Sequence, residues 1–375
     1  MKRVAIVTSW ASRCGIAEYT RSLVLAVPAG RFEFFVLADH EVDFTDKSGL
    51  LVERCWQKTG DDVTGILEAV QRLAIDLVVV EFNWGYLNPR PLRTLLTGIR
   101  AAGVPVVVQM HSTDDRVIDG IPQSLSDLAF ELSAARALVV HSDADERRMQ
   151  QLAPGAPIER ALLGQDSYPD ESASAVRAAL GIETHTPVLA SFGFLFPHKG
   201  VLETIQALPL MQSDWPEMAF LAVCSVIPSM LVSVMHWRRC QLEIRRLDLA
   251  GSVALITDFL APEAAMTLLH AADVIVLPYV ETFESASAAA RFALSSRRPM
   301  VTTSSPIFDL LGDAVFRIPD ASPEAIATGV KRVLEDQALR ADLLLAASEA
   351  SAAADWSVAG VCFADMLDRA LVTPA

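Results

Sequence analysis

The sequence predicts an α/β protein built from two Rossmann-like, doubly wound domains. The chain has 375 residues, and at a soft prior of about 150 residues per domain this length favours two domains. In each half, short apolar segments typical of buried parallel strands alternate with amphipathic segments typical of helices. A polar stretch that carries glycine and proline, GQDSYPDESAS from Gly164, separates the two series as a linker. Ligands of such domains bind at the carboxyl ends of the strands, so we expect a cleft between the two domains.

The first half supplies five strand-like and four helix-like segments. Its apolar runs are short and flanked by polar turns, which predicts a parallel sheet with helices on both faces. The expected strands are Val4–Thr8, Phe34–Leu37, Leu77–Glu81, Pro105–Gln109 and Ala137–His141, and the expected helices are Ile16–Val27, Thr64–Leu73, Pro91–Ala101 and Leu125–Ala135.

The second half repeats this alternation after the linker and ends in a further helix, Val358–Leu371, preceded by Trp356. We therefore expect domains at 1–165 and 166–352. The strands predicted here are Val188–Phe192, Met218–Cys224, Val253–Thr257, Val274–Leu277 and Met300–Thr302, and the helices are Val201–Leu208, Met230–Leu247, Pro262–His270 and Ser287–Leu294.

The charge balance restricts the partners of the protein. A formal net charge of −15 argues against nucleic-acid binding, which needs a surface rich in lysine and arginine. We expect no strongly basic amphipathic helix, and no apolar run approaches the length of a membrane span. The N-terminus lacks the pattern of a signal peptide, so we expect a cytoplasmic protein. The five scattered cysteines argue against a disulfide framework and a structural zinc site: Cys14, Cys55, Cys224, Cys240 and Cys362.

Candidate site residues in the first half follow strand ends. Gly15 lies in a strand-to-helix turn, where a missing side chain lets backbone N–H groups approach a ligand. Glu81, Asn83 and Trp84 follow a strand, and such polar and aromatic groups suit a sugar. His111 follows the next strand and can orient a hydroxyl. Ordinary turn chemistry, core aromatics and a structural histidine remain alternatives of about equal weight.

Asp143 and Asp145 form a D-x-D pair, which in other settings holds a divalent cation. Here the pair directly follows a strand and opens a helix, with Glu146 in its first turn. Capping and the helix dipole explain acidic residues at such a position. We therefore favour a helix cap over a metal site.

Candidate residues in the second half suit a diphosphate. Lys199 precedes Gly200 at the expected start of a helix, which would put a cation beside oriented N–H groups. Glu284 follows another strand and opens a run of small residues, where backbone groups can approach phosphate: Ser285, Ala286 and Ser287. Arg291 lies seven residues after Glu284, on the same face if one helix holds both. The alternative is a capped helix with a solvated arginine.

The ordered segments CGIAEYT, FGFLFPHKG and ADVIVLPYVETFESASAAAR, followed by RPMVTT, resemble retaining glycosyltransferases of the GT-B fold, family 4, also called glycosyl transferases group 1. His111 lies between the first two segments. The resemblance spans nearly the whole chain. It implies that 353–375, with Trp356, forms a closing helix that packs back on the N-terminal domain.

The resemblance also implies roles for single residues. Gly15 corresponds to a glycine at the donor phosphate and acceptor site, His111 to a histidine near the reacting sugar, and Lys199 to a phosphate-binding lysine. Glu284 corresponds to a carboxylate on the donor sugar, and the backbone of Ser285, Ala286 and Ser287 to a diphosphate site.

Two positions depart from the family pattern. Phe194 stands where an arginine is usual, and Phe292 stands where a ribose-binding glutamate is usual. Arg291, beside Phe292, can supply the positive charge that position 194 lacks. The departures indicate a divergent subgroup.

The implied reaction is metal-independent transfer of a sugar, with retention, from a UDP- or GDP-linked donor to a glycan or lipid-linked acceptor. The acceptor would enter over Gly15, Glu81, Asn83, Trp84 and His111. The resemblance implies polysaccharide or lipopolysaccharide assembly, with peripheral contact at the inner membrane face left open. Two other functions also remain open, a nucleotide-sugar epimerase of the same fold and a non-catalytic nucleotide-binding partner of another transferase.

Overall fold

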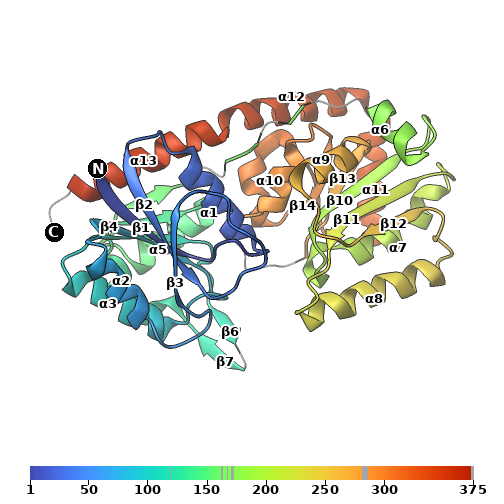
Figure 1. The fold of residues 1–375 in the computed structure, drawn as a ribbon. Coiled ribbons are helices and arrows are strands. Elements are labelled where there is room, and N and C mark those ends of the chain that lie inside the picture. Colours follow the sequence, from blue (N-terminus) through green and yellow to red (C-terminus); the bar gives the residue numbers. More distant parts are fainter. Residues whose placement is uncertain (119, 162–163, 167, 170–172, 281–285, 373–375) are drawn as a thin grey trace. The chain divides into compact units, whose positions relative to one another are not determined.

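A computed structural model describes residues 1–118, 120–161, 164–166, 168–169, 173–280 and 286–372 (Figure 1). The chain divides into two compact units. Unit 1 is built mainly from Met1–Gly164 and Ala354–Ala375, and unit 2 from Gln165–Thr282 and Ser287–Ala353.

Unit 1 contains a parallel sheet of seven strands in the order β3-β2-β1-β4-β5-β8-β9. An antiparallel hairpin of β6 (Arg116–Ile118) and β7 (Ile121–Gln123) follows β5 in the chain. The strands of the sheet are β1 (Lys2–Thr8), β2 (Phe32–Asp39), β3 (Leu51–Trp56), β4 (Leu77–Phe82), β5 (Val106–Met110), β8 (Ala137–Val140) and β9 (Ile158–Arg160).

The two faces of this sheet carry different helices. One face packs with a single large apolar core, to which β1 contributes Ala5 and Val7 and β4 contributes Val78 and Val80. The elements on this face are α2 (Thr64–Arg72), α3 (Pro89–Ala101), η1 (Leu125–Leu128), α4 (Ala129–Ser133) and α5 (Asp143–Leu152).

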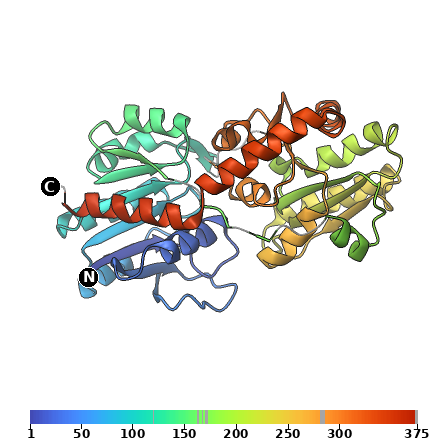
Figure 2. The ribbon, with the colours of Figure 1, turned by 90° about the horizontal axis from the view of Figure 1, so that it is seen from above.

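The opposite face of the sheet lies beneath α1 (Gly15–Ala26) and the C-terminal helix α13 (Trp356–Val372), which run side by side (Figures 1 and 2). The two helices approach closely because α13 has Gly360 at the contact. A Cβ atom there would lie 2.2 Å from the carbonyl oxygen of Ala26. Arg31, just before β2, pairs with Asp365 and Asp368 of α13. The last helix therefore completes the first unit.

Unit 2 contains a parallel sheet of six strands in the order β12-β11-β10-β13-β14-β15. This order reverses direction between β10 and β13, which in open α/β sheets is where ligands bind. The strands are β10 (Val188–Phe194), β11 (Ala219–Ser225), β12 (Val253–Ile256), β13 (Val274–Leu277), β14 (Met300–Thr303) and β15 (Phe316–Ile318).

Two apolar cores sandwich the second sheet. One core includes α7 (Val201–Gln212), α8 (Leu231–Arg246) and α11 (Pro323–Glu335). The other includes α6 (Ala173–Leu180), α9 (Pro262–His270), α10 (Ala288–Leu294), η3 (Pro306–Ala314) and α12 (Gln337–Ala353). Doubly wound sheets with helices on both faces are the fold class that the sequence predicts.

The structure adds elements that the sequence pattern did not predict, among them β3, β6, β7, β9, β15, α11 and α12. It also corrects the linker, because α6 begins at Ala173, inside the polar stretch. Arg177 of α6 is buried and its guanidinium lies 2.5 Å from the carboxylate of Asp273. The expected linker therefore ends in a short, packed helix. Within the described part of the chain, no helix is long and apolar enough to cross a membrane.

Candidate functional site

The carboxyl edge of the first sheet carries polar side chains on the face covered by α1 and α13. Because side chains alternate along a strand, Thr8, Glu81 and Gln109 share the face opposite the large apolar core. Glu81 and Gln109 are register partners on β4 and β5. All three are fully buried. Buried polar groups at a strand end of this kind are typical of a functional site.

Glu81 and His111 form the central pair of unit 1. The Nε2 atom of His111 lies 2.5 Å from Oε2 of Glu81, and Glu81 is only 1% exposed. In a neutral imidazole the proton is then held at Nε2 and the Nδ1 atom is an acceptor. Glu81 therefore orients His111. The structure corrects the expectation that Glu81 itself contacts a sugar, because its carboxylate is enclosed. Oε2 pairs with His111, and Oε1 is buried without a hydrogen-bond partner among the described residues.

Two further aromatic side chains enclose this pair. The ring of His141 stacks on that of His111, with centroids 5.0 Å apart, and Tyr19 meets both imidazoles edge-on. Gln109 donates its amide to the Tyr19 hydroxyl at 2.7 Å. Burial holds the pKa of His141 well below its usual range, and burial together with Glu81 raises the pKa of Tyr19. Both groups are therefore neutral near pH 7.

The other first-half candidates serve the local structure. Trp84 is buried in the apolar core and donates its indole N–H to the carbonyl of Asp114, so the predicted stacking on a sugar is wrong. Asn83 accepts from the N–H of Gly85 and donates to the Ser112 hydroxyl.

Gly15 is the first residue of α1 and is exposed. A Cβ atom on Gly15 would meet nothing within 4 Å. The fold itself therefore does not require a glycine at this position.

The capping interpretation of the D-x-D pair is confirmed. The Ser142 hydroxyl accepts from the N–H of Asp145 at 3.1 Å, at the start of α5. Asp145 is buried and also accepts a hydrogen bond from Thr113. Asp143 pairs with Arg160 on the neighbouring strand β9. Both carboxylates thus support the helix start.

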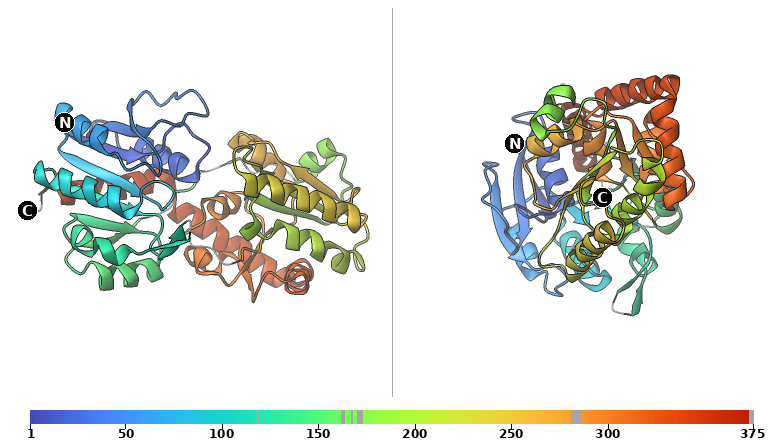
Figure 3. Two further views of the ribbon diagram at one scale, coloured as in Figure 1. Left: turned by 90° about the horizontal axis from the view of Figure 1, so that it is seen from below. Right: turned by 90° about the vertical axis from the view of Figure 1, so that its right-hand side faces the viewer.

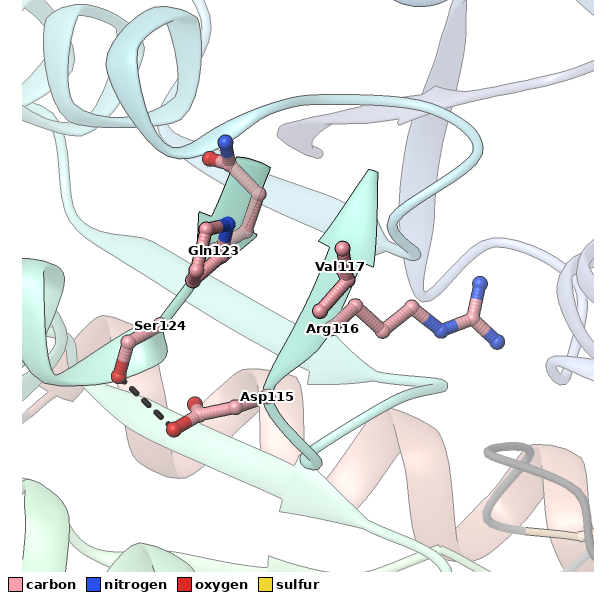
Figure 4. A pocket seen from close by; sticks show the side chains of 6 residues that line it. Asp115, Arg116, Val117, Gln123 and Ser124 are labelled. Atoms are coloured by element: carbon pink, nitrogen blue, oxygen red, sulfur yellow. Dashed lines mark hydrogen bonds between the residues drawn. The ribbon is translucent and has the colours of Figure 1, made fainter. Parts of the chain in front are cut away.

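An open pocket of about 520 Å³ lies beside the β6–β7 hairpin (Figure 4). Asp115 accepts from the Ser124 hydroxyl and from the N–H of Leu125, which fixes the turn on one side of the pocket. Its lining contains none of the residues predicted for an acceptor: Asp115, Arg116, Val117, Pro122, Gln123 and Ser124.

In unit 2, Lys199 lies between β10 and α7, in the short 3-10 turn Pro197–Lys199. Gly200 follows as the N-cap of α7 with a left-handed φ of 72°. A Cβ atom on Gly200 would lie 2.2 Å from the carbonyl oxygen of Pro278, so only glycine fits between this turn and the end of β13. Lys199 therefore directly precedes the N-cap of α7, next to the helix start that the sequence predicts.

Tyr279 links Lys199 to the start of α10. The Lys199 ammonium lies 4.1 Å from the centre of the Tyr279 ring, a favourable cation–π distance. The Tyr279 hydroxyl lies 3.2 Å from the Ser287 hydroxyl, which also caps α10 by accepting from the N–H of Ala290. Ser287 is therefore the N-cap of α10, in agreement with the predicted helix start.

Arg291 of α10 is only 8% exposed. Its Nε atom is buried without a hydrogen-bond acceptor among the described residues, and burial lowers the pKa of the guanidinium. A buried cation without a counter-charge is costly. Because α10 begins only at Ala288, helical periodicity does not relate Arg291 to Glu284. Glu284 and Ser285 lie outside the described residues, and Ala286 precedes the helix in irregular backbone.

The two departures from the family pattern both enter aromatic clusters. Phe292 stacks on Phe192 with centroids 4.5 Å apart and meets Tyr168 edge-on, so its side chain belongs to the core. Phe194 stacks on the half-exposed ring of Phe259 at 5.9 Å. Phe194 thus offers an aromatic face at the strand end where the family pattern has a cation.

Comparison with known proteins shows a similarity in the second unit. Residues 186–336 match the model of glycosyl transferases group 1. The matched residues fall in the sequence range of unit 2 and make up less than half of the chain. A D-inositol 3-phosphate glycosyltransferase of Corynebacterium glutamicum (strain R) is 27% identical over 206 residues, which are 54% of this chain and 47% of the relative. The match thus spans about half the length of that relative.

Solved structures show that the fold of this chain is GT-B. Sucrose-phosphate synthase from Thermosynechococcus elongatus has a TM-score of 0.79 at 14% identity, covering 98% of this chain and 99% of that one. Anabaena Alr3699/HepE in complex with UDP has a TM-score of 0.78 at 18% identity, covering 98% and 100%. At these identities the similarity shows the fold alone.

Sequence reasoning did not find three residues that line the candidate sites. The sequence pattern places His141 at a strand end and Tyr19 and Tyr279 within longer motifs, and it predicts no site role for them. For His141 a signal was present, since it follows β8 as His111 follows β5, and both lie on the face of Glu81. For Tyr19 and Tyr279 the signal is tertiary, because each contacts its site through a neighbouring element.

Proposed function

We propose that this protein is a glycosyltransferase that moves a sugar from a nucleoside-diphosphate sugar to a hydroxyl acceptor. The donor nucleotide is UDP or GDP, the anomeric configuration is retained, and no metal takes part. The product is part of a polysaccharide or lipopolysaccharide made on the cytoplasmic side of the membrane, from a glycan or lipid-linked acceptor. The observation that carries this proposal is the buried guanidinium of Arg291, which has no counter-charge in the described part of unit 2.

Unit 2 binds the donor through its diphosphate. A diphosphate supplies the negative charge that Arg291 needs, and Lys199 is tied to the same region through Tyr279 and Ser287. Negative charge on the leaving phosphate grows as the glycosidic bond breaks, so both cations stabilise the transition state more than the ground state. Phe194 and Phe259 offer aromatic faces on which the nucleobase stacks.

Unit 1 binds the acceptor at His111. Glu81 fixes the ring of His111 through Nε2, which leaves Nδ1 to accept a hydrogen bond from the acceptor hydroxyl. The neutral ring of His141 backs this imidazole. The proton of the acceptor finally passes to the leaving phosphate, which becomes the nucleoside diphosphate.

The proposal is tested by measuring thermal unfolding of the full chain with UDP, GDP or inorganic phosphate. The nucleotide that binds the folded state raises the melting temperature, since a ligand at about 100 times its Kd adds about 2.7 kcal/mol of stability. Arg291→Gln abolishes this rise, and Lys199→Ala lowers turnover of the nucleotide sugar by about 10²-fold. Arg332→Gln, at an exposed ion pair of α11, is the matched control and keeps both properties.

A rise in melting temperature that survives Arg291→Gln would place the anion elsewhere and contradict the donor site. The core position of Phe292 favours one alternative, a nucleotide-binding partner without catalysis. That protein would show the same melting shift but release no nucleoside diphosphate from any donor sugar.

A further inference from the structure

The outer surface of α8 has an arrangement that the proposed reaction does not use. Figure 3 shows α8 as the outermost helix on its side of unit 2. Eight of its side chains are exposed: Leu231, Val232, Met235, Arg238, Arg239, Leu242, Arg245 and Arg246. We call these residues the α8 surface. At about 100° per residue they fall within an arc of about 140°.

The order of side chains across this arc is regular. Leu231, Met235 and Leu242 occupy its middle and are 73%, 53% and 64% exposed. Helical geometry puts two arginines on each side of this apolar stripe. Arg238 and Arg245 lie on one side, and Arg239 and Arg246 lie on the other.

The α8 surface is positively charged on an acidic protein. The helix carries four arginines and one acidic residue, Glu243, so these five residues give a local charge of 4 − 1 = +3, whereas the chain carries −15. Glu243 pairs with Arg246. Among the residues that the structure describes, no ion pair engages Arg238, Arg239 or Arg245. The charge of this surface is therefore available to an anionic partner.

The inner side of α8 holds the helix firmly in place. Cys240 and Ile244 are part of the apolar core. The Ser233 hydroxyl donates to the carbonyl of Leu195 and accepts from the N–H of Ile227. The α8 surface thus lies on a rigid helix, so its backbone loses little conformational entropy on binding.

We propose that the α8 surface docks unit 2 on a bilayer that contains anionic phospholipids. An exposed apolar stripe bordered by arginines is the pattern of a helix that lies in a membrane interface. This corrects the expectation that the chain has no strongly basic amphipathic helix. The apolar side chains enter the boundary between headgroups and acyl chains, while the arginines bind lipid phosphates. A second copy of this chain is a poor partner, because it would set two basic surfaces against each other between two acidic molecules.

The test is co-sedimentation of the full chain with vesicles of phosphatidylcholine alone or with phosphatidylglycerol, without donor or acceptor. We expect binding only to the anionic vesicles and its loss at high salt. Arg238→Gln with Arg239→Gln weakens binding about fivefold for each charge, and Leu242→Ser with Met235→Ser also weakens it. Leu345→Ser, at an exposed leucine of α12, and Arg332→Gln are matched controls that bind as the wild type does.

Absence of binding to anionic vesicles would overturn the proposal, and so would equal binding by the α8 variants. A dimer of the wild type that the Leu242→Ser variant loses, measured by light scattering, would show that a second copy covers this surface and would also overturn it. Vesicle binding is measured without any reaction. Failure of vesicle binding therefore leaves the proposed transferase activity unaffected. Failure of the transferase activity likewise leaves the proposed membrane docking unaffected.

Discussion

Single residues at the unit 1 site derive their chemistry from burial. Glu81 comes from a strand that is otherwise apolar, LVVVEF, and a carboxylate in such a place is tolerated only with a partner. His111 is that partner, and its own orientation depends on the pair. The same enclosure acts on His141, whose ring nitrogens are buried and have no hydrogen-bond partner among the described residues.

The buried His141 predicts how stability changes with pH. Its pKa in the folded state is depressed, while in the unfolded chain it is near 6.5. The unfolded state therefore binds a proton first as the pH falls, and stability is lost below the unfolded pKa, toward the lower folded pKa. The slope is at most about 1.4 kcal/mol per pH unit.

Replacement of His141 by Asn removes this dependence. Urea unfolding at pH 7.5 and 5.5 measures it, because the wild type should lose about 1 kcal/mol more than the variant over this interval. The comparison with the variant cancels the contribution of the carboxylates. Parallel losses in both proteins would show that His141 is already charged in the folded state or accessible to protons.

At the scale of elements, the turn between β10 and α7 decides where Lys199 lies. Gly200 has a left-handed φ and a close backbone neighbour in Pro278, whereas Gly181 has a similar φ of 70° and open space around it. The two glycines share a left-handed φ and differ in crowding, so Gly181 serves as the control for Gly200.

We expect Gly200→Ala to cost more stability than Gly181→Ala. Both variants pay about 1 kcal/mol for a left-handed alanine, and only the first must also move the end of β13. Gly200→Ala should in addition lose nucleotide binding, because the turn that carries Lys199 shifts. Urea midpoints and the melting shift with nucleotide measure the two effects. Equal costs for both variants would mean that the contact with Pro278 relaxes freely.

At the scale of the whole molecule, unit 1 is completed by the last helix of the chain. The contact of α13 with α1 joins residues more than three hundred positions apart, as do the ion pairs of Arg31 with Asp365 and Asp368. Gly164, at the end of the first stretch of unit 1, lies against the Trp356 ring so closely that a Cβ atom would overlap it. The C-terminal helix is therefore part of the core of unit 1.

Phe363 of α13 tests this contribution. It is 7% exposed, and Phe363→Ala should cost about 3–5 kcal/mol, as deletion of a buried phenyl ring does. Val361→Ala lies two residues away on the exposed side of the same helix and should change stability by less than about 0.5 kcal/mol. Urea unfolding of both variants gives the comparison. A small effect of Phe363→Ala would mean that unit 1 is stable without α13.

The sequence alone predicted the fold class because a parallel sheet is buried on both faces. Strands such as Val274–Leu277 are therefore continuous apolar runs, and the helices between them keep an amphipathic period. Elements with weaker signals were missed: the edge strand β3 is partly exposed, and α6 is a short helix that begins at the end of a polar stretch. Lys199 and His111 were predicted as site residues because parallel strands end at one edge of the sheet.

Only the tertiary structure decided how these residues are buried and paired. Spacing in the sequence could not tell that Glu81 is enclosed against His111 or that Trp84 belongs to the core. Nor could it tell that Arg291 is a buried cation with no counter-charge among the described residues. It also did not show that the arginines of α8 border an apolar stripe on the surface. Burial and pairing depend on what other elements bring to the same place. A local pattern predicts which face of a helix or strand is apolar and which is polar. The packing of other elements determines which residues each face contacts.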